Sequence, residues 1–208
     1  MIDCQTPQDF QNITNVSRET LDKLTLYGEL LAKWQASIHL VSKNTLNAMW
    51  QRHFLDSAQL APLIHEFGSD RAICVDMGAG AGFPGLVLAA MGAGHWTLVE
   101  SDTRKCVFLN EVVRQCEISA TIRNERVEGI TDLQADIVTG RAFASLDQLL
   151  AYAAGVSKPA ATHIYPKGQR ADEELAIARQ TWRFDVEERD SMTDDNGKIL
   201  IIQGVARA

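Results

Sequence analysis

The chain has 208 residues, of which 46% are hydrophobic and 23% are charged. This length and balance are typical of one globular domain with a small extension, and they exclude a disordered chain, a collagen-like repeat and a disulfide scaffold. A net charge of −7 disfavours indiscriminate binding to nucleic acid or to an anionic membrane, but it does not exclude a local basic patch.

The cysteines indicate a reducing environment. No two form a Cys-x-x-Cys pair and none has a histidine at zinc-ligand spacing, so we predict free thiols in the core and no metal site. They are Cys4, Cys74, Cys106 and Cys116. The first residues lack the basic and apolar regions of a signal peptide, and no apolar stretch approaches the ~20 residues of a transmembrane helix. We therefore expect a cytoplasmic protein with no membrane partner.

Residues 1–68 predict a helical extension. Ser17 can cap a helix whose apolar residues recur at three- and four-residue spacing. These are Leu21, Leu24, Tyr27, Leu31 and Trp34. A second helix is predicted after Asn44, with Pro62 and Gly68 at its end. We expect the extension to pack on the domain that follows, so that both form one compact unit.

Residues 69–208 alternate between predicted strands and helices. Strands are predicted at 72–77, 95–100, 120–124, 136–139, 163–165, 184–188 and 198–203, and helices at 84–91, 103–116, 145–154 and 171–180. Repeated strand–helix units indicate an α/β fold with a doubly wound, mostly parallel sheet. The last two strands are joined by a polar turn, which indicates an antiparallel edge strand.

Glycines follow the first predicted strand, in the segment 75–85 with the sequence Val-Asp-Met-Gly-Ala-Gly-Ala-Gly-Phe-Pro-Gly. One interpretation is the Gly-x-Gly-x-x-Gly fingerprint of dinucleotide-binding oxidoreductases, which starts here at Gly80. The other is the Asp-x-Gly-x-Gly-x-Gly turn of S-adenosylmethionine-dependent methyltransferases, which starts at Asp76. The position of Asp76 and the helical extension favour the second interpretation.

Glu100 ends the second predicted strand, twenty residues after Gly80. An acidic side chain at this position can accept hydrogen bonds from both hydroxyls of a ribose. Both interpretations of the glycine turn predict such a residue, so Glu100 indicates nucleoside binding without choosing between them.

Further motifs occur in order along the chain. They are Lys-Trp (33–34), Leu-Val-Ser (40–42), Arg-His-x-x-Asp-Ser (52–57), Gly-Phe-Pro-Gly (82–85), Leu-Val-Glu-Ser (98–101), Arg-Lys-x-x-Phe-Leu (104–109), Arg-x-Glu (126–128), Arg-Ala (141–142) and Lys-Gly (167–168). Together they resemble the ribosomal RNA small subunit methyltransferase G family, also called glucose-inhibited division protein B, over about residues 30–170. One departure is Trp34-Gln35…His39-Leu40, where the family has Trp-Asn…Asn-Leu. Because this segment is far from the glycine turn in sequence, we interpret the departure as a packing or surface change.

The resemblance implies a Rossmann-like class I fold and methyl transfer from S-adenosylmethionine to N7 of one guanine in 16S rRNA. The implied cofactor-binding residues are Gly78, Gly80, Phe83, Glu100, Val127, Glu128 and Arg141. Val127 and Glu128 would border the adenine, and Arg141 would stand beside the methyl donor. No general base is required, because guanine N7 carries a free lone pair at neutral pH. The implied partner is 16S rRNA within the small subunit or an assembly intermediate, and we expect a monomer.

Cations near the same sheet edge are candidates for RNA binding. Arg104 and Lys105 begin a helix, where the helix dipole favours anions, and Lys167 follows a later strand. Arg52 and His53 join them by the family resemblance, although the pattern equally fits an intrahelical pair of Arg52 with Asp56 and a half-buried histidine. Two other functions stay open: an NAD(P)-dependent oxidoreductase, and a ribosome-assembly binding protein without transferase activity.

Overall fold

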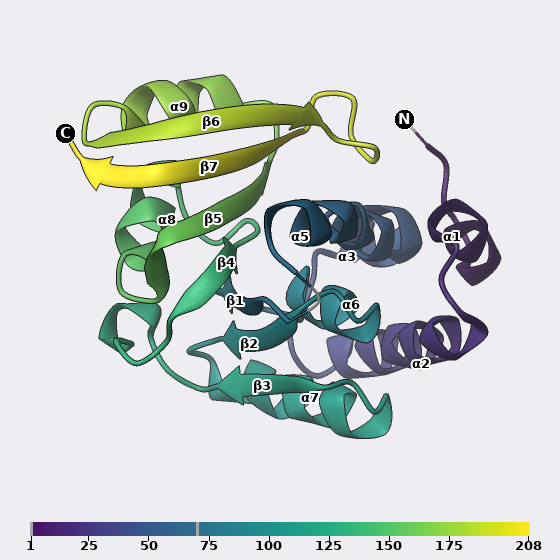
Figure 1. Ribbon diagram of the computed structural model, residues 1–208. Coiled ribbons are helices and arrows are strands. Elements are labelled where there is room, and N and C mark those ends of the chain that lie inside the picture. Colours follow the sequence, from purple (N-terminus) through teal and green to yellow (C-terminus); the bar gives the residue numbers. More distant parts are fainter. Residues whose placement is uncertain (1, 70) are drawn as a thin grey trace.

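The computed structural model describes residues 2–69 and 71–208. Within these residues one seven-stranded sheet has the order β3-β2-β1-β4-β5-β7-β6 (Figure 1). The strands are β1 (Ile73–Met77), β2 (His95–Val99), β3 (Ala120–Arg123), β4 (Ala135–Thr139), β5 (Ser157–Lys167), β6 (Trp182–Asp190) and β7 (Lys198–Arg207). The strand order reverses between β1 and β4, so the predicted doubly wound α/β fold is confirmed.

The reversed strand does not lie at the edge of the sheet. Neighbours among β1 to β5 pair in parallel, whereas β7 pairs antiparallel with both β5 and β6. The connection through α9 (Ala171–Ala178) carries β6 one strand position away from β5, and the following hairpin returns β7 into the gap. The predicted antiparallel edge is therefore confirmed: the edge strand β6 pairs antiparallel with β7, and β7 is the strand whose direction is reversed.

The helices before the sheet are α1 (Pro7–Thr14), α2 (Arg18–Gln35), α3 (Lys43–Leu46), the π-helical η1 (Trp50–Leu55), α4 (Asp56–Ala58) and α5 (Ala61–Phe67). Ser17 caps α2 as predicted, since its side chain accepts a hydrogen bond from the Thr20 N–H. Pro62, expected near a helix end, lies in the first turn of α5, where a missing N–H costs little. The later helices are α6 (Gly85–Ala90), α7 (Thr103–Gln115), the 3₁₀ turn η2 (Val127–Gly129) and α8 (Leu146–Ala153).

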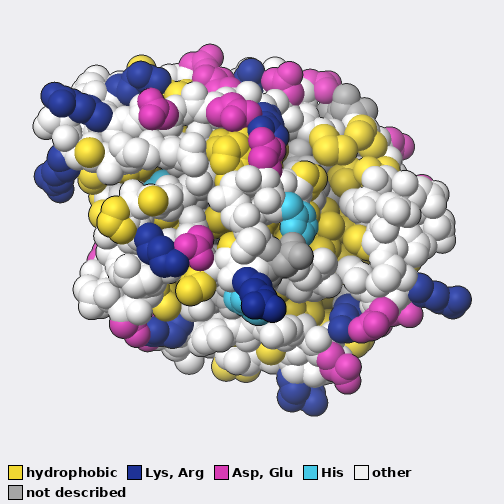
Figure 2. Space-filling view, in the orientation of Figure 1, with side chains coloured by type: hydrophobic (Ala, Val, Ile, Leu, Met, Phe, Trp, Pro, Cys, Tyr) yellow, Lys and Arg dark blue, Asp and Glu magenta, His cyan; other side chains and the backbone are white. Residues whose placement is uncertain are grey.

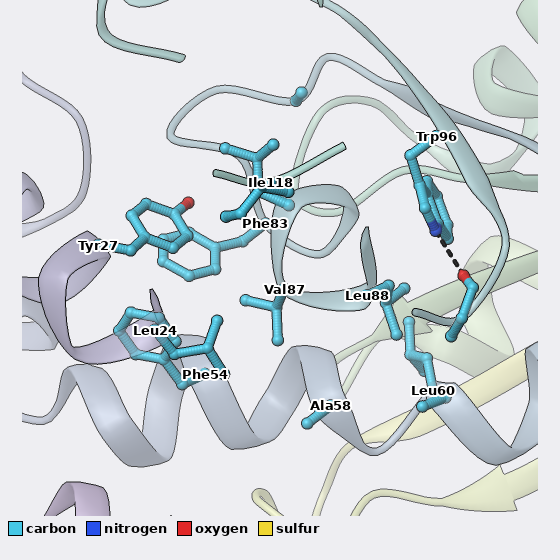
Figure 3. Packing of buried hydrophobic residues seen from close by; sticks show 14 of the residues in the cluster. Leu24, Tyr27, Phe54, Ala58, Leu60, Phe83, Val87, Leu88, Trp96 and Ile118 are labelled. Atoms are coloured by element: carbon cyan, nitrogen blue, oxygen red, sulfur yellow. Dashed lines mark hydrogen bonds between the residues drawn. The ribbon is translucent and has the colours of Figure 1, made fainter. Parts of the chain in front are cut away.

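The extension packs directly on the glycine turn. The Tyr27 ring of α2 stacks on Phe83 with 5.2 Å between ring centroids and an interplanar angle of 13°. Its hydroxyl donates a hydrogen bond to the carbonyl of Ala81, and Phe54 meets the Phe83 ring edge-on. Figure 3 shows Tyr27, Phe54 and Phe83 within the buried cluster. Each fully buried large apolar side chain stabilises the fold by about 1.5–3 kcal/mol, so this cluster anchors the turn. The boundary between the extension and the domain at residues 68 and 69 stays a prediction.

The four cysteines are buried free thiols, as predicted. Burial raises the pKa of Cys74 to about 12 and that of Cys116 to about 11, which leaves both thiols protonated and unreactive at neutral pH. In the described part of the chain, no helix is both long and apolar enough to cross a membrane.

Two buried histidines should control stability in mild acid. Burial lowers the pKa of His163 to about 4 and that of His53 to about 3, against 6.5 in an exposed site. Between pH 6.5 and 4 the unfolded chain therefore binds more protons, and stability falls as the pH falls. Each histidine contributes about 1.4 kcal/mol per pH unit.

Buried Asp76 has the opposite effect on stability below pH 6 and offsets the effect of one histidine. Burial raises the pKa of Asp76 to about 6, so the folded state binds its proton at a higher pH than the unfolded chain does. We expect His163→Phe to lower the pH slope of the free energy of unfolding by about 1.4 kcal/mol per unit between pH 6 and 5. Urea unfolding from pH 7 to 4.5 measures this slope. An unaltered slope would contradict the assignment of His163.

Candidate active site

The carboxyl ends of β1, β2 and β4 meet at one edge of the sheet, and two adjoining cavities lie there. The smaller cavity, of about 230 Å³, is lined by Gly78, Val99–Ser101, Glu125–Glu128, Phe143, Ala144, Gln148 and Tyr152. The larger cavity, of about 420 Å³, is lined by Leu40, Val41, His53, Gly78–Ala81, Phe83, Glu100, Lys105 and Arg141–Phe143. Every residue predicted to bind the cofactor lines one cavity or both.

The glycine turn is open toward the larger cavity. Gly78 and Gly80 have φ angles of 64° and 58°, in the left-handed region that side chains disfavour. A Cβ atom on Gly80 would meet only one atom within 4 Å, the Gly78 carbonyl oxygen at 3.8 Å. The turn therefore leaves a space beside its backbone that a ligand can fill.

The Asp76 side chain holds this turn in place through hydrogen bonds. Its carboxylate, fully buried, accepts hydrogen bonds from the Gly85 N–H at 3.0 Å and from the Thr139 hydroxyl at 3.1 Å. These bonds join the glycine turn to the end of β4. The aspartate of the sequence motif thus holds the loop in shape and lines neither cavity.

Glu100 stands where the two cavities meet. One carboxylate oxygen accepts a hydrogen bond from the Gly80 N–H at 2.9 Å, and the other accepts one from the Asp102 N–H at 2.8 Å. The residue is only 7% exposed. Because each carboxylate oxygen has two lone pairs, both oxygens can still accept a further hydrogen bond from a ligand in the cavities.

Arg141 joins β4 to the helical extension. Its guanidinium donates to the Asp56 carboxylate at 2.8 Å and to the Arg52 carbonyl at 3.1 Å, and its carbon lies 5.3 Å from the centre of the Phe83 ring. The intrahelical pair of Arg52 with Asp56 is therefore wrong. In the π-helical turn η1, residues four apart no longer align, and Arg52 pairs instead with Asp194 at 3.4 Å.

His53 is buried, not half-buried, with 7% of its surface exposed. It stacks on Phe83 at 5.0 Å, and its Nδ1 lies 3.0 Å from an Arg141 nitrogen. Burial is the main cause that lowers its pKa to about 3, and the nearby Arg141 charge adds to it. Because arginine can only donate, Nδ1 accepts and the hydrogen is assigned to Nε2, which has no hydrogen-bond partner among the described residues.

The other predicted cations occupy three different environments. Arg104 is exposed and pairs at 3.2 Å with Asp102, the residue that caps α7. The Lys167 side chain is only 8% exposed and pairs at 2.8 Å with Glu174 of α9. Lys105 has no ionic partner among the described residues and lines the larger cavity. Their contacts with RNA stay predictions, and the geometry favours Lys105 because its charge is free.

A loop of the helical extension, which the sequence analysis did not place at the site, lines the larger cavity through Leu40 and Val41. The Gln35 side-chain oxygen accepts hydrogen bonds from the N–H groups of Leu40 and Val41, both at 3.0 Å, and its nitrogen donates to the Val41 carbonyl at 2.7 Å. The departure Trp34-Gln35…His39-Leu40 thus lies beside the site in the fold, although it is far from the glycine turn in sequence, and Gln35 serves the packing of this loop. Only the tertiary fold brings this segment near the glycine turn.

Solved structures with this architecture identify the fold. A TehB-like methyltransferase from Corynebacterium glutamicum superimposes with a TM-score of 0.59 at 12% identity, over 86% of this chain and 98% of that chain. A ribosomal protein L11 methylase from Lactobacillus delbrueckii gives a TM-score of 0.54 at 16% identity, over 73% and 78%. At such identities the likeness shows the fold alone, which is that of class I S-adenosylmethionine-dependent methyltransferases.

Sequence similarity is more specific. The family model described as "rRNA small subunit methyltransferase G" matches residues 20–202. Relatives of that name from Paramagnetospirillum magneticum and Rhodospirillum rubrum are 46% and 42% identical over 201 and 203 residues, which is 97% and 98% of this chain and 97% and 100% of theirs. The chain belongs to the rRNA small subunit methyltransferase G family and is an S-adenosylmethionine-dependent methyltransferase. Membership of this family favours neither of the two alternatives, the NAD(P)-dependent oxidoreductase and the ribosome-assembly protein without transferase activity.

Glu100→Ala should weaken binding of S-adenosylmethionine and S-adenosylhomocysteine equally, because both carry the same ribose hydroxyls. Loss of hydrogen bonds to a charged acceptor costs about 1.5–3 kcal/mol, or roughly ten- to hundredfold in affinity. The variant also removes the acceptor of the Gly80 N–H. Calorimetric titration of both ligands measures the effect. Unchanged dissociation constants would show that Glu100 serves the loop alone.

Proposed function

We propose that this protein transfers a methyl group from S-adenosylmethionine to N7 of one guanine in the 16S rRNA of the small ribosomal subunit or its assembly intermediate. The observation that carries the proposal is the convergence of all predicted cofactor residues on two adjoining cavities at one sheet edge. We further propose that the protein acts in the cytoplasm as a monomer.

The two cavities suit the two ends of the cofactor. The adenine would lie in the smaller cavity beside Val127 and Glu128, and the methionine part in the larger cavity beside Gly80 and Phe83. Glu100, which lines both, would accept the ribose hydroxyls between them. The open space beside Gly80 supports this placement, because among the described residues, apart from its chain neighbours, only the Gly78 oxygen would lie within 4 Å of a Cβ there.

The proposed chemistry requires no general base. When bound, the cofactor would supply an electrophilic methyl group on its sulfonium: the lone pair of guanine N7 would form the new N–C bond while the S–C bond breaks, and S-adenosylhomocysteine would leave with that electron pair. The protein must align the two, and alignment of this kind can supply about 7–11 kcal/mol of the barrier. His53 accepts from Arg141 through Nδ1, and the Asp76 carboxylate holds the glycine turn, so neither is free to remove a proton.

Base-resolution mapping of N7-methylguanine tests this function directly. Small-subunit RNA from cells with and without the gene should differ at one guanine, and the purified protein with S-adenosylmethionine should restore the modification in vitro. A methyl group found on another atom, or no transfer to any small-subunit particle, would contradict the proposal.

Unpaired cations at the rims of the cavities are the ones that we expect to contact RNA phosphates. On the face in Figure 2, Lys and Arg lie dispersed among Asp and Glu instead of forming one basic patch. Lys105, Arg126 and Arg170 line the larger cavity, the smaller cavity and a neighbouring cleft, and none has an ionic partner among the described residues. Their replacement by Ala should flatten the log–log salt dependence of binding to the small subunit by roughly 0.7–0.9 per lost contact.

The matched control replaces the same number of charges at Arg18, Lys33 and Arg183, which are exposed cations outside the three cavities. We expect this variant to keep the wild-type salt slope. Titration of S-adenosylmethionine accompanies the measurement, because Lys105 also lines the cavity assigned to the cofactor. Equal slopes for the two variants would contradict a specific role of the rim cations.

A further inference from the structure

A cleft of about 730 Å³ adjoins the larger cavity. It extends from the loop after β4 to the hairpin between β6 and β7, and its lining includes Arg52, Lys167, Arg170, Glu173, Ile177 and Asp194. The cleft shares His53 and Arg141–Phe143 with the larger cavity. A group bound in the cleft would therefore face the residues that surround the proposed methyl donor.

Most charges that line this cleft neutralise one another. The pairs are Arg52 with Asp194 at 3.4 Å, Arg141 with Asp56 at 2.8 Å, and Lys167 with Glu174 at 2.8 Å; Lys198 pairs at 3.1 Å with Asp190, which lies outside the lining. Of the remaining charged side chains, Arg170 and Glu173 have opposite signs. A row of phosphates would find little net attraction inside such a lining. An uncharged planar group with hydrogen-bonding edges fits it better.

Phe143 stands at the junction of the cleft and the two cavities. It is the one described residue that lines all three. Its ring is 40% exposed and lies over Gly78, where a Cβ atom would overlap it, and its nearest aromatic neighbour is Tyr152 at 5.7 Å. The preceding residue, Ala142, has a φ of 50°, which sets the loop at a sharp angle. An exposed aromatic ring next to a cleft is the usual platform on which a nucleobase stacks.

We propose that the cleft receives the target guanine, splayed out of its RNA loop, and that Phe143 is the ring on which the guanine stacks. This inference rests on the proposed function. The ring now lies over Gly78, between the halves of the cofactor site. The same residue also borders the cleft, so the ring stands between the proposed cofactor site and the proposed base site.

Phe143→Ala separates this role from a role in the cofactor site. Stacking of one base on an aromatic ring accounts for roughly ten- to hundredfold in affinity. We expect the catalytic efficiency of methyl transfer to purified small subunits to fall by that factor, mainly through KM. The affinity for S-adenosylhomocysteine should change far less than this factor, because Glu100 and the open backbone at Gly80, to which the cofactor contacts are assigned, stay in place. Phe143→Trp should retain efficient transfer.

Val107→Ala is the matched control, since Val107 is an exposed apolar residue of α7 that lines neither the cleft nor the cavities. Wild-type protein that methylates guanine N7 in the same assay establishes the proposed function independently of Phe143. Given that result, wild-type efficiency of Phe143→Ala would overturn the inference. So would a loss of S-adenosylhomocysteine affinity equal to the loss of transfer, because Phe143 would then be a wall of the cofactor site.

Discussion

Gly80→Val should abolish binding of S-adenosylmethionine while the protein stays folded. The new side chain would project into the larger cavity, where only the Gly78 oxygen lies within 4 Å of its Cβ. The left-handed φ of 58° adds backbone strain of about 1–2 kcal/mol, which lowers stability without unfolding a typical domain. Calorimetric titration should show affinity reduced by more than about a hundredfold, as expected when the space for a ligand is filled.

Gly92→Val is the control for the strain itself. Gly92 has a φ of 74°, a Cβ there would meet no atom within 4 Å, and the residue lies outside the two cavities. Both variants should lose similar free energy of unfolding in urea, and only Gly80→Val should lose the cofactor. Gly78→Val is a less specific test, because its Cβ would also displace the Phe143 ring. If Gly92→Val weakened cofactor binding as much as Gly80→Val does, backbone strain would explain the loss of affinity in both variants, and the filling of the larger cavity would not.

The fold could be predicted because its signals are local. Short apolar runs such as β1 and β2 alternate with helices of three- and four-residue periodicity, and each pattern reports its own element. The position of β7 could not be predicted in this way. Which strand the hairpin pairs with depends on the space left between β5 and β6, and that space depends on where the α9 connection places β6.

The site was predictable to the extent that it lies in one loop or at a strand end. Gly78, Gly80 and Glu100 follow parallel strands directly, so the topology alone brings them to the same sheet edge. The closeness of Gln35 to the site could not be predicted, because its contacts with Leu40 and Val41 come near the turn only after the extension has folded against it. Sequence distance is a poor guide wherever a helical extension folds back on the domain.

Ion pairs across elements were the least predictable feature. The Lys167 charge is neutralised by Glu174, seven residues later, only because the start of α9 faces the end of β5. Asp56 likewise pairs with Arg141, 85 residues away, in preference to its helical neighbour Arg52. A charge pattern along one helix cannot report a competing partner that another element supplies, and the competition decides which cations remain free.

Arg141→Ala should lower methyl transfer more than the loss of stability explains. The guanidinium donates to Asp56, to the Arg52 carbonyl and to His53, so its removal leaves the Asp56 carboxylate without its cation. We expect the free energy of unfolding to fall by about 1.5–3 kcal/mol, the usual value for hydrogen bonds to charged groups. Transfer to small subunits should fall roughly hundredfold or more if the charge also aligns donor and base, which is an alignment effect of several kcal/mol.

Asp56→Asn in the Arg141→Ala background distinguishes the two roles. The isosteric amide removes the unpaired charge, so the double variant should regain part of the lost stability. If Arg141 acts on the reaction itself, methyl transfer stays low in the double variant although the fold is restored. Recovery of transfer together with stability would show that Arg141 only holds the extension in place. Urea unfolding and labelled-methyl transfer on the same preparations decide between these outcomes, because a contact that serves the fold alone must move both measurements together.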